Sequence, residues 1–344
     1  MESDQQKHED LDVDIFCPHD GEGIAALFRS IYGEEYPVRL VYNPAELIAA
    51  FERRENIPIV ARTKDGRIVA HEALYRSSPN PKVYEAGQGL VAQEWRGSGV
   101  NARINHHILN TLAPGLDIDA VFGEAVCNHV YMQKGWGKFG TIETGIEVDL
   151  MPQEAYAAEG SATGRVATLF MFRNYRERKQ IVHLPGIYRD QLEFIYSAFP
   201  DLPEFKAGRG SLPLEPSRME TQIFDFAKVA RMTIKSPGAD FEAVLADRQK
   251  VLVNHGIVVL QAWLNLSWPF INKVIEILRK HGYFFGGLLP AWFGTDGLLM
   301  QKIMEQPNWE GINLYSDRAK EILAFVRADW SRVGSPSSPP KQYL

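Results

Sequence analysis

Two glycines in the run Arg96-Gly97-Ser98-Gly99 separate an apolar stretch from an amphipathic one, and this turn constrains the fold more than any other feature of the chain. The stretch before it, from about Val83 to Ala92, has the composition of a strand. From Val100 on, apolar residues recur at helical spacing until Pro114-Gly115. The sequence therefore predicts a strand, a tight glycine turn and a helix in direct succession.

Such a turn is suited to hold an anion. A helix N-terminus has unpaired backbone N–H groups and the positive end of the helix dipole. Gly97 and Gly99 have no side chain that would keep a phosphate away, and glycine permits the twist that directs several N–H groups inward. Arg96 can add a charge-assisted contact. A glycine turn without any ligand is the alternative that these residues alone leave open.

The elements around the turn form a characteristic order. Over residues 13–151 the patterns predict a strand, two helices, three strands, a helix, a strand, a short helix from Asn128 to Lys134 and a last strand. Asp65-Gly66 between alternating apolar runs is typical of a β-hairpin. Meandering strands followed by one strand–helix–strand crossover predict a mixed α/β fold of the α+β type, with a twisted, mostly antiparallel central sheet.

The length of 344 residues predicts two domains. The second half shows a similar order in looser form, with a single strand over 222–234, a helix over 239–254 and a helix from Asp317 to about Val333. We interpret it as a degenerate repeat of the first half. The predicted divisions are a disordered tail 1–12, a first domain 13–151, a linker 152–164, a second domain 165–333 and a disordered tail 334–344.

The glycine turn resembles motif A of the GNAT superfamily of N-acetyltransferases, (Gln/Arg)-x-x-Gly-x-(Gly/Ala). Glu94, Gly97 and Gly99 take the first, fourth and sixth places, and Arg96 to Val100 match the expanded form Arg-Gly-x-Gly-(Ile/Val). The family's aromatic-x-x-x-Gly-Phe segment is matched by Tyr131 to Trp136, with Trp in place of Phe. Glu94 for Gln/Arg and Asn101 for a small residue depart from the pattern. Neither departure removes a backbone donor, but Glu94 places a carboxylate near a polyanion.

The resemblance implies an acyl-coenzyme A site on the first half, with acetyl-CoA as the expected donor. In the family, the strand before the turn holds the thioester carbonyl, and the turn holds the pyrophosphate. The residues implied to bind the cofactor are Leu90, Val91, Ala92, Gln93, Arg96, Gly97, Ser98, Gly99, Val100, Asn101 and Asn128.

The resemblance also assigns catalytic candidates. Tyr131 lies four residues before Gly135, as does the family's general acid, and a phenol stays protonated at neutral pH. Glu85 lies where family members often place a carboxylate base that acts through water, and Glu72 is a weaker candidate. An aromatic that packs the short helix, and a solvated strand glutamate, are the structural alternatives for Tyr131 and Glu85.

Several other reactive side chains are predicted to have structural rather than catalytic roles. His106 and His107 diverge around a helix by about 100° and cannot form one site. Cys127 is predicted to be a small buried hydrophobe rather than a nucleophile. For His129, a packed residue and a contact with the substrate or the pantetheine arm are both open. No His/Cys/Asp/Glu group has metal-ligand spacing, so no metal is predicted. In the second half Arg-Gly-x-Gly is missing and Leu278 stands in the place of Tyr131, which predicts one active site per chain.

The expected function is acyl-CoA-dependent N-acyl transfer to a small-molecule or peptide amine. A net charge of −6 argues against nucleic acid as a partner, and no apolar run approaches the ~18 residues of a membrane span. Two cysteines and an acidic N-terminus indicate the cytoplasm, and a homodimer is an open expectation. Two alternatives stay open: a non-catalytic acyl-CoA-binding module and, more remotely, a nucleotide-dependent oxidoreductase, since Gly97 to Ala102 also fit G-x-G-x-x-(G/A).

Overall fold

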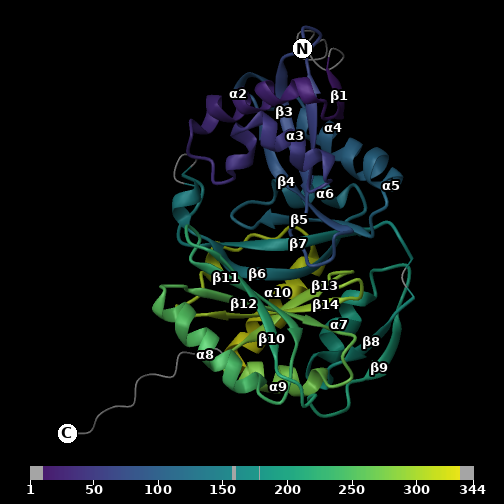
Figure 1. Cartoon of the computed structure of the whole chain (residues 1–344), viewed down its shortest axis with the longest axis vertical. Coiled ribbons are helices and arrows are strands. Elements are labelled where there is room, and N and C mark those ends of the chain that lie inside the picture. The colour runs from purple at the N-terminus through teal and green to yellow at the C-terminus, as the bar shows by residue number, and fades with distance from the viewer. Residues whose placement is uncertain (1–10, 157–159, 178, 334–344) are drawn as a thin grey trace, which may run out of the picture. The chain divides into compact units, whose positions relative to one another are not determined.

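A computed structural model describes residues 11–156, 160–177 and 179–333 of the chain (Figure 1). The described residues form two compact units. The first holds 11–123, 138–140 and 173–176, and the second holds 124–137, 141–172 and the described residues from 177 on. Among the described residues, none of the helices combines the length and the apolar composition that a bilayer span requires.

The sheet of the first unit contains β1 (Asp12–Ile15), β2 (Asn56–Arg62), β3 (Ile68–Tyr75), β4 (Val83–Val91) and the start of β5 (Ala120–Val126), paired in that order. The pairs from β1 to β4 are antiparallel, whereas β4 and β5 are parallel. The hairpin predicted at Asp65-Gly66 joins β2 to β3, and Gly66 has the positive φ of +84° that its turn requires. The first half thus has the predicted mixed architecture.

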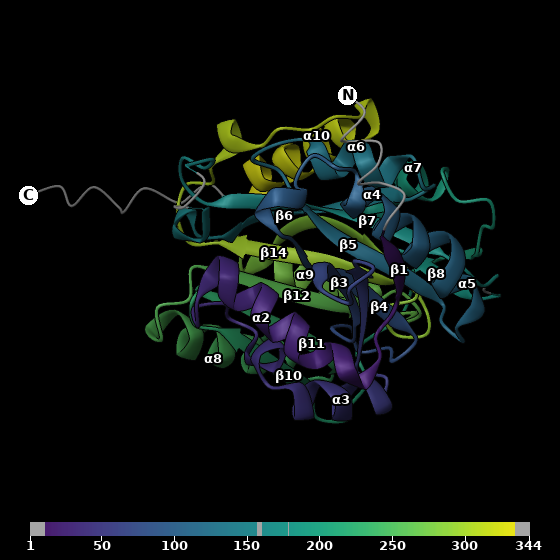
Figure 2. The same cartoon turned by 90° about the horizontal axis from the view of Figure 1, so that it is seen from above.

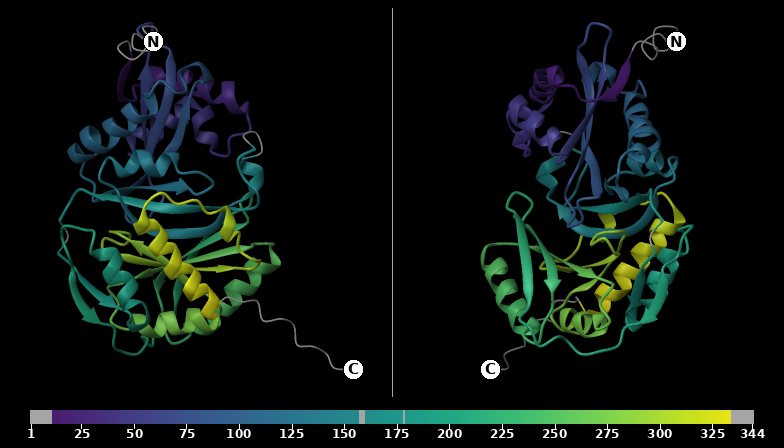
Figure 3. Two further views of the ribbon diagram at one scale, coloured as in Figure 1. Left: turned by 180° about the vertical axis from the view of Figure 1, so that it is seen from behind. Right: turned by 45° about the vertical axis from the view of Figure 1, so that its right-hand side comes forward.

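Helices cover both faces of this sheet. α2 (Gly21–Tyr32) and α3 (Pro44–Glu52) lie on one face and α4 (Val100–His106) on the other, as Figure 2 and the right panel of Figure 3 show. Asn43 caps α3 by accepting a hydrogen bond from the Glu46 amide, as its place before Pro44 predicts. α4 continues through a π-helical stretch, His107–Leu112, into α5 (Ala113–Gly115). The helix after the glycine turn is therefore continuous to the predicted end.

The sheet of the second unit contains the end of β5, β7 (Val166–Asn174), β6 (Ile142–Met151), β13 (Phe284–Leu289), β14 (Gly297–Ile303), β12 (Val259–Asn265), β11 (Val229–Ser236) and β10 (Arg218–Phe224), in that order. The neighbours from β7 to β12 pair antiparallel, β11 and β12 pair parallel, and β10 and β11 antiparallel. β8 (Ile181–Leu184) and β9 (Glu204–Ala207) form a separate parallel pair.

The helices of the second unit are α6 (Tyr131–Gly137), α7 (Arg189–Tyr196), α8 (Phe241–Asn254), α9 (Ile271–Lys280) and α10 (Asp317–Val333). α10, drawn in yellow, crosses β6 and β13 (Figure 3, left). Short 3-10 turns complete both units: Pro18–Asp20, Arg39–Tyr42, Gln93–Trp95, Gln153–Tyr156, Gly186–Tyr188 and Trp309–Gly311.

The pairing directions of the first half recur in the second. β3 and β4 are antiparallel, α4 follows, and β5 lies parallel to β4. β10 and β11 are likewise antiparallel, α8 follows, and β12 lies parallel to β11. Two stretches of chain therefore build the same local topology in the same order.

Three predictions differ from the structure. The single strand predicted over 222–234 is two strands, β10 and β11, joined by a turn at 225–228 where Lys228 has a φ of +52°. The short helix predicted from Asn128 begins only at Tyr131. Leu11, predicted in a tail, is buried, and Asp12 begins β1, whereas 1–10 and the tail 334–344 lie outside the described residues.

The compact units do not coincide with the predicted domains. β6, α6 and most of β7 group with the second unit, so packing divides the chain near Gly123 rather than at 152–164. The compact units reflect contacts, whereas the predicted domains reflect a repeated order of elements. The division into two repeats therefore stays a proposal.

Candidate functional site

The glycine turn has the backbone conformation that its sequence predicts. The chain leaves β4 through the turn Gln93–Trp95, and Gly97 and Gly99 then adopt φ values of +76° and +80°. Gly99 is the N-cap residue of α4. Ser98 Oγ donates to the carbonyl of Trp95 at 2.6 Å, and this hydrogen bond stabilises the turn. A side chain at either glycine would be strained, because L-residues avoid the left-handed region.

Charges beside the turn are arranged favourably for an anion. Arg96 is exposed. The carboxylate of Glu94 is 2.6 Å from Nη1 of Arg67, which lies in the β2–β3 hairpin. The Arg67 guanidinium offsets the negative charge of Glu94, so this carboxylate repels a bound polyanion less than an unpaired one would.

β4 contains a bulge just before the turn. His71 of β3 pairs with Leu90 and Ala73 pairs with Gly87, so two residues of β4, Gln88 and Gly89, stand opposite one residue of β3. Gln88 has a φ of +57°, and its carbonyl is 3.0 Å from Nδ1 of His71. Bulges often lie next to active sites, where they redirect backbone and side chains.

The pairing of β4 with β5 ends early. The register covers Val83 with Ala120, Tyr84 with Val121 and Glu85 with Phe122. Within the part of the chain that the structure describes, β4 has no β5 partner from Ala86 to Val91. This edge carries backbone groups that need hydrogen-bond partners, and an extended ligand can supply them. The predicted cofactor residues Leu90 and Val91 lie on it, whereas the amide of Ala92 donates to Val69.

Two titratable groups are buried behind the bulge. Glu72 accepts a hydrogen bond from Asn105 Nδ2 at 3.0 Å, and a Cβ atom at Gly89 would lie 3.8 Å from its carboxyl carbon. Burial raises the pKa of Glu72 to about 8, so the carboxyl is protonated at neutral pH. Burial lowers the pKa of His71 to about 4 and keeps its ring neutral. A neutral Glu72 is a poor base at pH 7.

We expect replacement of Glu72 by glutamine to flatten the loss of stability towards alkaline pH. The folded-state pKa lies above the ordinary value of 4.5, so the group stabilises the fold fully below pH 4.5, and this contribution is lost as the pH rises towards about 8. Glutamine never ionises and can still accept from Asn105. At pH 8.5 urea unfolding should show Glu72→Gln more stable than wild type by about 1 kcal/mol or more, with no such gain at pH 5. Equal differences at both pH values would contradict a buried neutral carboxyl.

Glu85, the predicted base, is half-buried near the start of β4. It is paired in register with Tyr75 of β3 and Phe122 of β5, just where the β4–β5 pairing ends. Burial and the nearby negative charges, Glu85 among them, raise the pKa of Tyr36. Glu85 is thus positioned at the start of the unpaired edge of β4.

Tyr131 and Asn128 belong to the second unit. Tyr131, the first residue of α6, is 77% exposed, and its ring centroid lies 5.0 Å from that of His129. Most of the Tyr131 side chain is therefore accessible, and the alternative of an aromatic that packs the short helix stays open. Asn128 donates to Ser161 Oγ at 3.0 Å, and its Oδ1 atom is buried without a hydrogen-bond partner. The catalytic and cofactor roles of these residues stay predictions.

The surroundings of Cys127, His106 and His107 are consistent with the structural roles predicted for them. Cys127 is fully buried, and burial raises the pKa of its thiol, which makes it a poor nucleophile. His107 faces Asp14 at 3.8 Å, while the ring of His106 stands edge-on to Phe139. The two histidines therefore point to different neighbours, as their helical spacing predicts.

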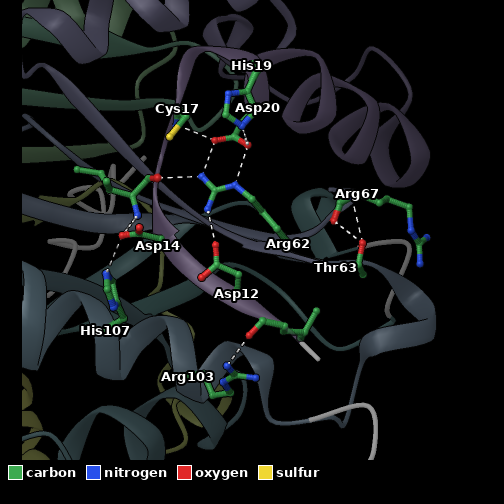
Figure 4. A network of polar contacts seen from close by, with 12 residues as sticks. Asp12, Asp14, Cys17, His19, Asp20, Arg62, Thr63, Arg67, Arg103 and His107 are labelled. Carbon is green, nitrogen blue, oxygen red and sulfur yellow. Dashed lines mark hydrogen bonds and ion pairs between the residues drawn. The ribbon is translucent and has the colours of Figure 1, made fainter. Parts of the chain in front are cut away.

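One group of potential metal ligands escaped the sequence analysis. Ligand atoms of Cys17, His19 and Asp20 lie within 4.8 Å of one another, at a spacing that the sequence itself displays. Figure 4 shows that Arg62 approaches both oxygens of Asp20, at 2.8 and 2.6 Å, and also reaches Asp12. The Asp20 carboxylate is thus already paired with Arg62. We therefore interpret the group as a structural contact that ties β1 and the turn after it to β2, rather than as a metal site.

The chain was compared with protein families, with curated proteins and with solved structures. No family model and no curated relative matches the sequence. Solved structures that resemble the chain include an N-acetyltransferase from Staphylococcus aureus, which is 14% identical, with a TM-score of 0.39, over 48% of this chain and 99% of that one. A ribosomal-protein-S5-alanine acetyltransferase from Vibrio fischeri is 12% identical, with a TM-score of 0.39, over 49% and 95% of the two chains.

A third neighbour is an aminoglycoside 6′-N-acetyltransferase complexed with coenzyme A, which is 13% identical, with a TM-score of 0.36, over 49% of this chain and 99% of that one. In each case the similarity covers about half of this chain.

The sequence analysis missed two features of this site. The bulge has a visible signal, because Gly87 and Gly89 flank Gln88 in a strand where glycine is unusual. The Arg67–Glu94 pair has no such signal, because 27 positions separate the two residues and only the hairpin brings them together.

Proposed function

We propose that the chain is an acyl-CoA-dependent N-acyltransferase, with acetyl-CoA as the expected donor and an amine as acceptor. One observation carries the proposal: a bulged strand with an unpaired edge leads directly into a turn with two left-handed glycines, which ends at a helix N-terminus. An unpaired strand edge suits an extended amide-containing arm, and the turn suits a pyrophosphate. Coenzyme A has both parts in that order.

The proposed chemistry is direct transfer. The amine nitrogen loses a proton to a base, bonds to the thioester carbon and displaces the thiolate as the carbon–sulfur bond breaks. Glu85 is the proposed base, acting through water. Tyr131 is the proposed acid that gives its proton to the leaving sulfur. Exposure of Tyr131 supports a role in contact with a ligand rather than in packing.

The second half supports a single site per chain. We interpret it as a repeat whose equivalent turn is closed by the chain itself. A Cβ atom at Gly238, between β11 and α8, would lie 1.7 Å from the carbonyl oxygen of Glu215. Ser217 Oγ accepts from the Gly238 amide at 2.8 Å, and the Ser217 amide donates to Asp240 at 2.8 Å. The position that a phosphate would take is therefore occupied by residues 215–217.

The pairing of β11 and β12 is consistent with this interpretation. These strands pair over five residues, from Val229 with Val259 to Thr233 with Trp263, whereas β4 and β5 pair over three. The unpaired edge of the first repeat is correspondingly reduced in the second. The low cysteine content supports a cytoplasmic protein, and a homodimer stays a proposal.

The test is coenzyme A binding followed by turnover. Isothermal titration is expected to give one coenzyme A per chain, and acetyl-CoA should release free thiol with at least one of spermidine, kanamycin and an alanyl peptide. Binding without release on any of these amines would favour the non-catalytic module. A protein that neither binds coenzyme A nor gains melting temperature from it would exclude both functions.

Replacement of Tyr131 by phenylalanine is expected to lower kcat at least about tenfold while the KM for acetyl-CoA stays the same. The reason is that phenylalanine keeps the ring but has no proton to give. Tyr315→Phe is the matched control, because Tyr315 is also exposed and in the same unit. If both variants keep wild-type kcat, Tyr131 has no part in the mechanism.

A further inference from the structure

A cavity of about 230 Å³ lies in the first unit, at the end of its sheet where β4 begins. It is lined from the segment after α3, the start of β2, the segment after β3, the start of β4 and the segment before β5. Its buried lining residues are Ile57, Tyr84 and Ile118. The glycine turn follows the other end of β4, roughly 25 Å away along the strand. The cavity is therefore separate from the proposed cofactor turn.

Exposed side chains give this cavity more positive than negative charge. Arg54, Arg76 and Lys82 line it together with one carboxylate, that of Asp117. Nζ of Lys82 lies 2.8 Å from the Asp117 carboxylate. Within the part of the chain that the structure describes, Arg54 and Arg76 have no carboxylate within 4 Å. Two guanidinium groups at the cavity thus have no counter-ion among the described residues.

Tyr84 holds both arginines in place. It is 3% exposed, and its OH group donates to the carbonyl of Arg54 at 2.8 Å. Nε of Arg76 donates to the same Tyr84 oxygen at 3.1 Å, and its guanidinium carbon lies 5.6 Å from the centroid of the ring. This contact uses one N–H group of Arg76 and leaves the four on its Nη atoms for a ligand.

The backbone of Arg54 has a conformation that favours a different residue type. Arg54 follows Arg53, the C-cap residue of α3, and its φ is +54°. Helices that end in this way usually have glycine at this position and sometimes asparagine, because other residues are strained there. Strained residues cluster at ligand sites, where the side chain has a use that offsets the strain. An arginine at this position is therefore consistent with a binding role.

The titration of Asp117 reflects the positive charge around the cavity. A hydrogen bond from Lys82 and the charge of Lys82, followed by the charges of Arg176 and Arg54, hold the pKa of Asp117 below its ordinary value. Arg176 belongs to the same unit, and its Nη2 donates to the carbonyl of Leu116 at 3.2 Å. An anionic group of a ligand in the cavity would be attracted by the same cations.

We propose that this cavity binds a small phosphate monoester, whose phosphate group is held by Arg54, Arg76 and Lys82 and whose organic part lies against the apolar lining. The three cations and Asp117 together carry two positive charges, and a phosphate monoester carries about −1.5 to −2 at pH 7. The guanidinium fork matches the oxygens of a phosphate. Drug-sized ligands occupy about 300–1,000 Å³, so this cavity suits a smaller molecule. The inference goes beyond the proposed acyltransferase function and does not depend on it.

The first test is isothermal titration with phenyl phosphate and glycerol 3-phosphate, in a buffer free of phosphate and sulfate. Saturating coenzyme A is present, so that the glycine turn is occupied. At least one monoester should bind with one molecule per chain, and the neutral parents, phenol and glycerol, should not bind. Benzoate, a monoanion with an aromatic ring, should bind at least about tenfold more weakly than phenyl phosphate. Benzoate that binds as tightly as the monoesters would contradict a site for a dianion.

The second test changes the charge of the cavity in both directions. Arg54→Asn removes a positive charge and should keep the fold, because asparagine tolerates the left-handed region. It should weaken the monoester at least about tenfold and leave coenzyme A binding unchanged. Asp117→Asn removes the negative charge and should tighten monoester binding about three- to tenfold. Arg53→Gln is the matched control, because Arg53 is exposed and outside the lining, and it should bind as wild type.

The outcomes separate this inference from the proposed function. If Arg54→Asn binds the monoester as tightly as wild type does, if coenzyme A prevents the monoester from binding, or if neither monoester binds, the inference fails and the proposed function stands. A thermal melt without ligand checks that Arg54→Asn is folded. If coenzyme A does not bind but a monoester binds and responds to Arg54→Asn and Asp117→Asn as expected, the proposed function fails and the inference stands.

Discussion

Replacing Gly97 by alanine is expected to weaken coenzyme A binding by about 100-fold, equivalent to roughly 2.8 kcal/mol. Two effects add. The left-handed φ of +76° is strained for alanine, and the new Cβ atom enters the space in front of the turn. No atom of the chain lies within 4 Å of that Cβ, so the variant should fold with its turn intact. Isothermal titration with coenzyme A measures the effect.

Gly66→Ala is the matched control for this variant. Gly66 has a φ of +84°, lies in the same unit and likewise has no atom within 4 Å of an added Cβ. Both variants should lose a similar stability, about 1–2 kcal/mol for an L-residue forced into the left-handed region. Only Gly97→Ala should lose coenzyme A. Parallel losses of affinity in both variants would show that backbone strain alone weakens binding, and the turn would not be the phosphate site.

The parts of this fold that follow from sequence depend on local signals. Asn43-Pro44 sets the start of α3, Asp65-Gly66 sets the first hairpin, and the spacing of apolar residues sets the bounds of α2 and α10. Capping and turn preferences act over a few residues, so a single sequence displays them. The left-handed conformations of Gly97 and Gly99 are local features of the same kind, which a single sequence also displays.

The β10–β11 hairpin was missed for the opposite reason. Its turn, residues 225–228, contains no glycine, proline or asparagine, and it includes an exposed apolar residue, Phe226. The sequence therefore predicts one continuous strand. Lys228 adopts its positive φ because strand pairing on both sides requires the chain to reverse there.

The charge states and surroundings of the acidic side chains could not be predicted from the sequence, because they depend on contacts between residues far apart in the chain. The pKa of Glu72 depends on burial behind β4 and on Asn105, 33 positions later. The environment of Glu124 depends on Arg231, 107 positions later. Neither has a spacing signature, because the residues meet only once the sheet has formed. Sequence patterns can indicate a cofactor turn, whereas the charge state of nearby acids follows from tertiary packing.

Removal of the Asp329 carboxylate is expected to destabilise the second unit by about 3–5 kcal/mol. Asp329, on α10, is 4% exposed and accepts from Tyr188 at 2.7 Å and from the Phe285 amide at 2.9 Å, and it pairs with Arg279. Phe285 lies at a bulge in β13, so its amide relies on this side chain. Asp329→Ala leaves a partly buried guanidinium without its carboxylate and should lower the melting temperature by on the order of 10 °C.

Asp317→Ala is the control within the same helix. Asp317 is fully exposed and pairs with Lys320 at 2.9 Å, so its loss should leave the melting temperature unchanged within about 1 °C. A double-mutant cycle then isolates the ionic contact. Asp329→Ala combined with Arg279→Met should recover part of the lost stability, because the unpaired cation is gone. If the double variant is no more stable than Asp329→Ala, the contacts with Tyr188 and Phe285 hold α10 against β13, and Arg279 adds little.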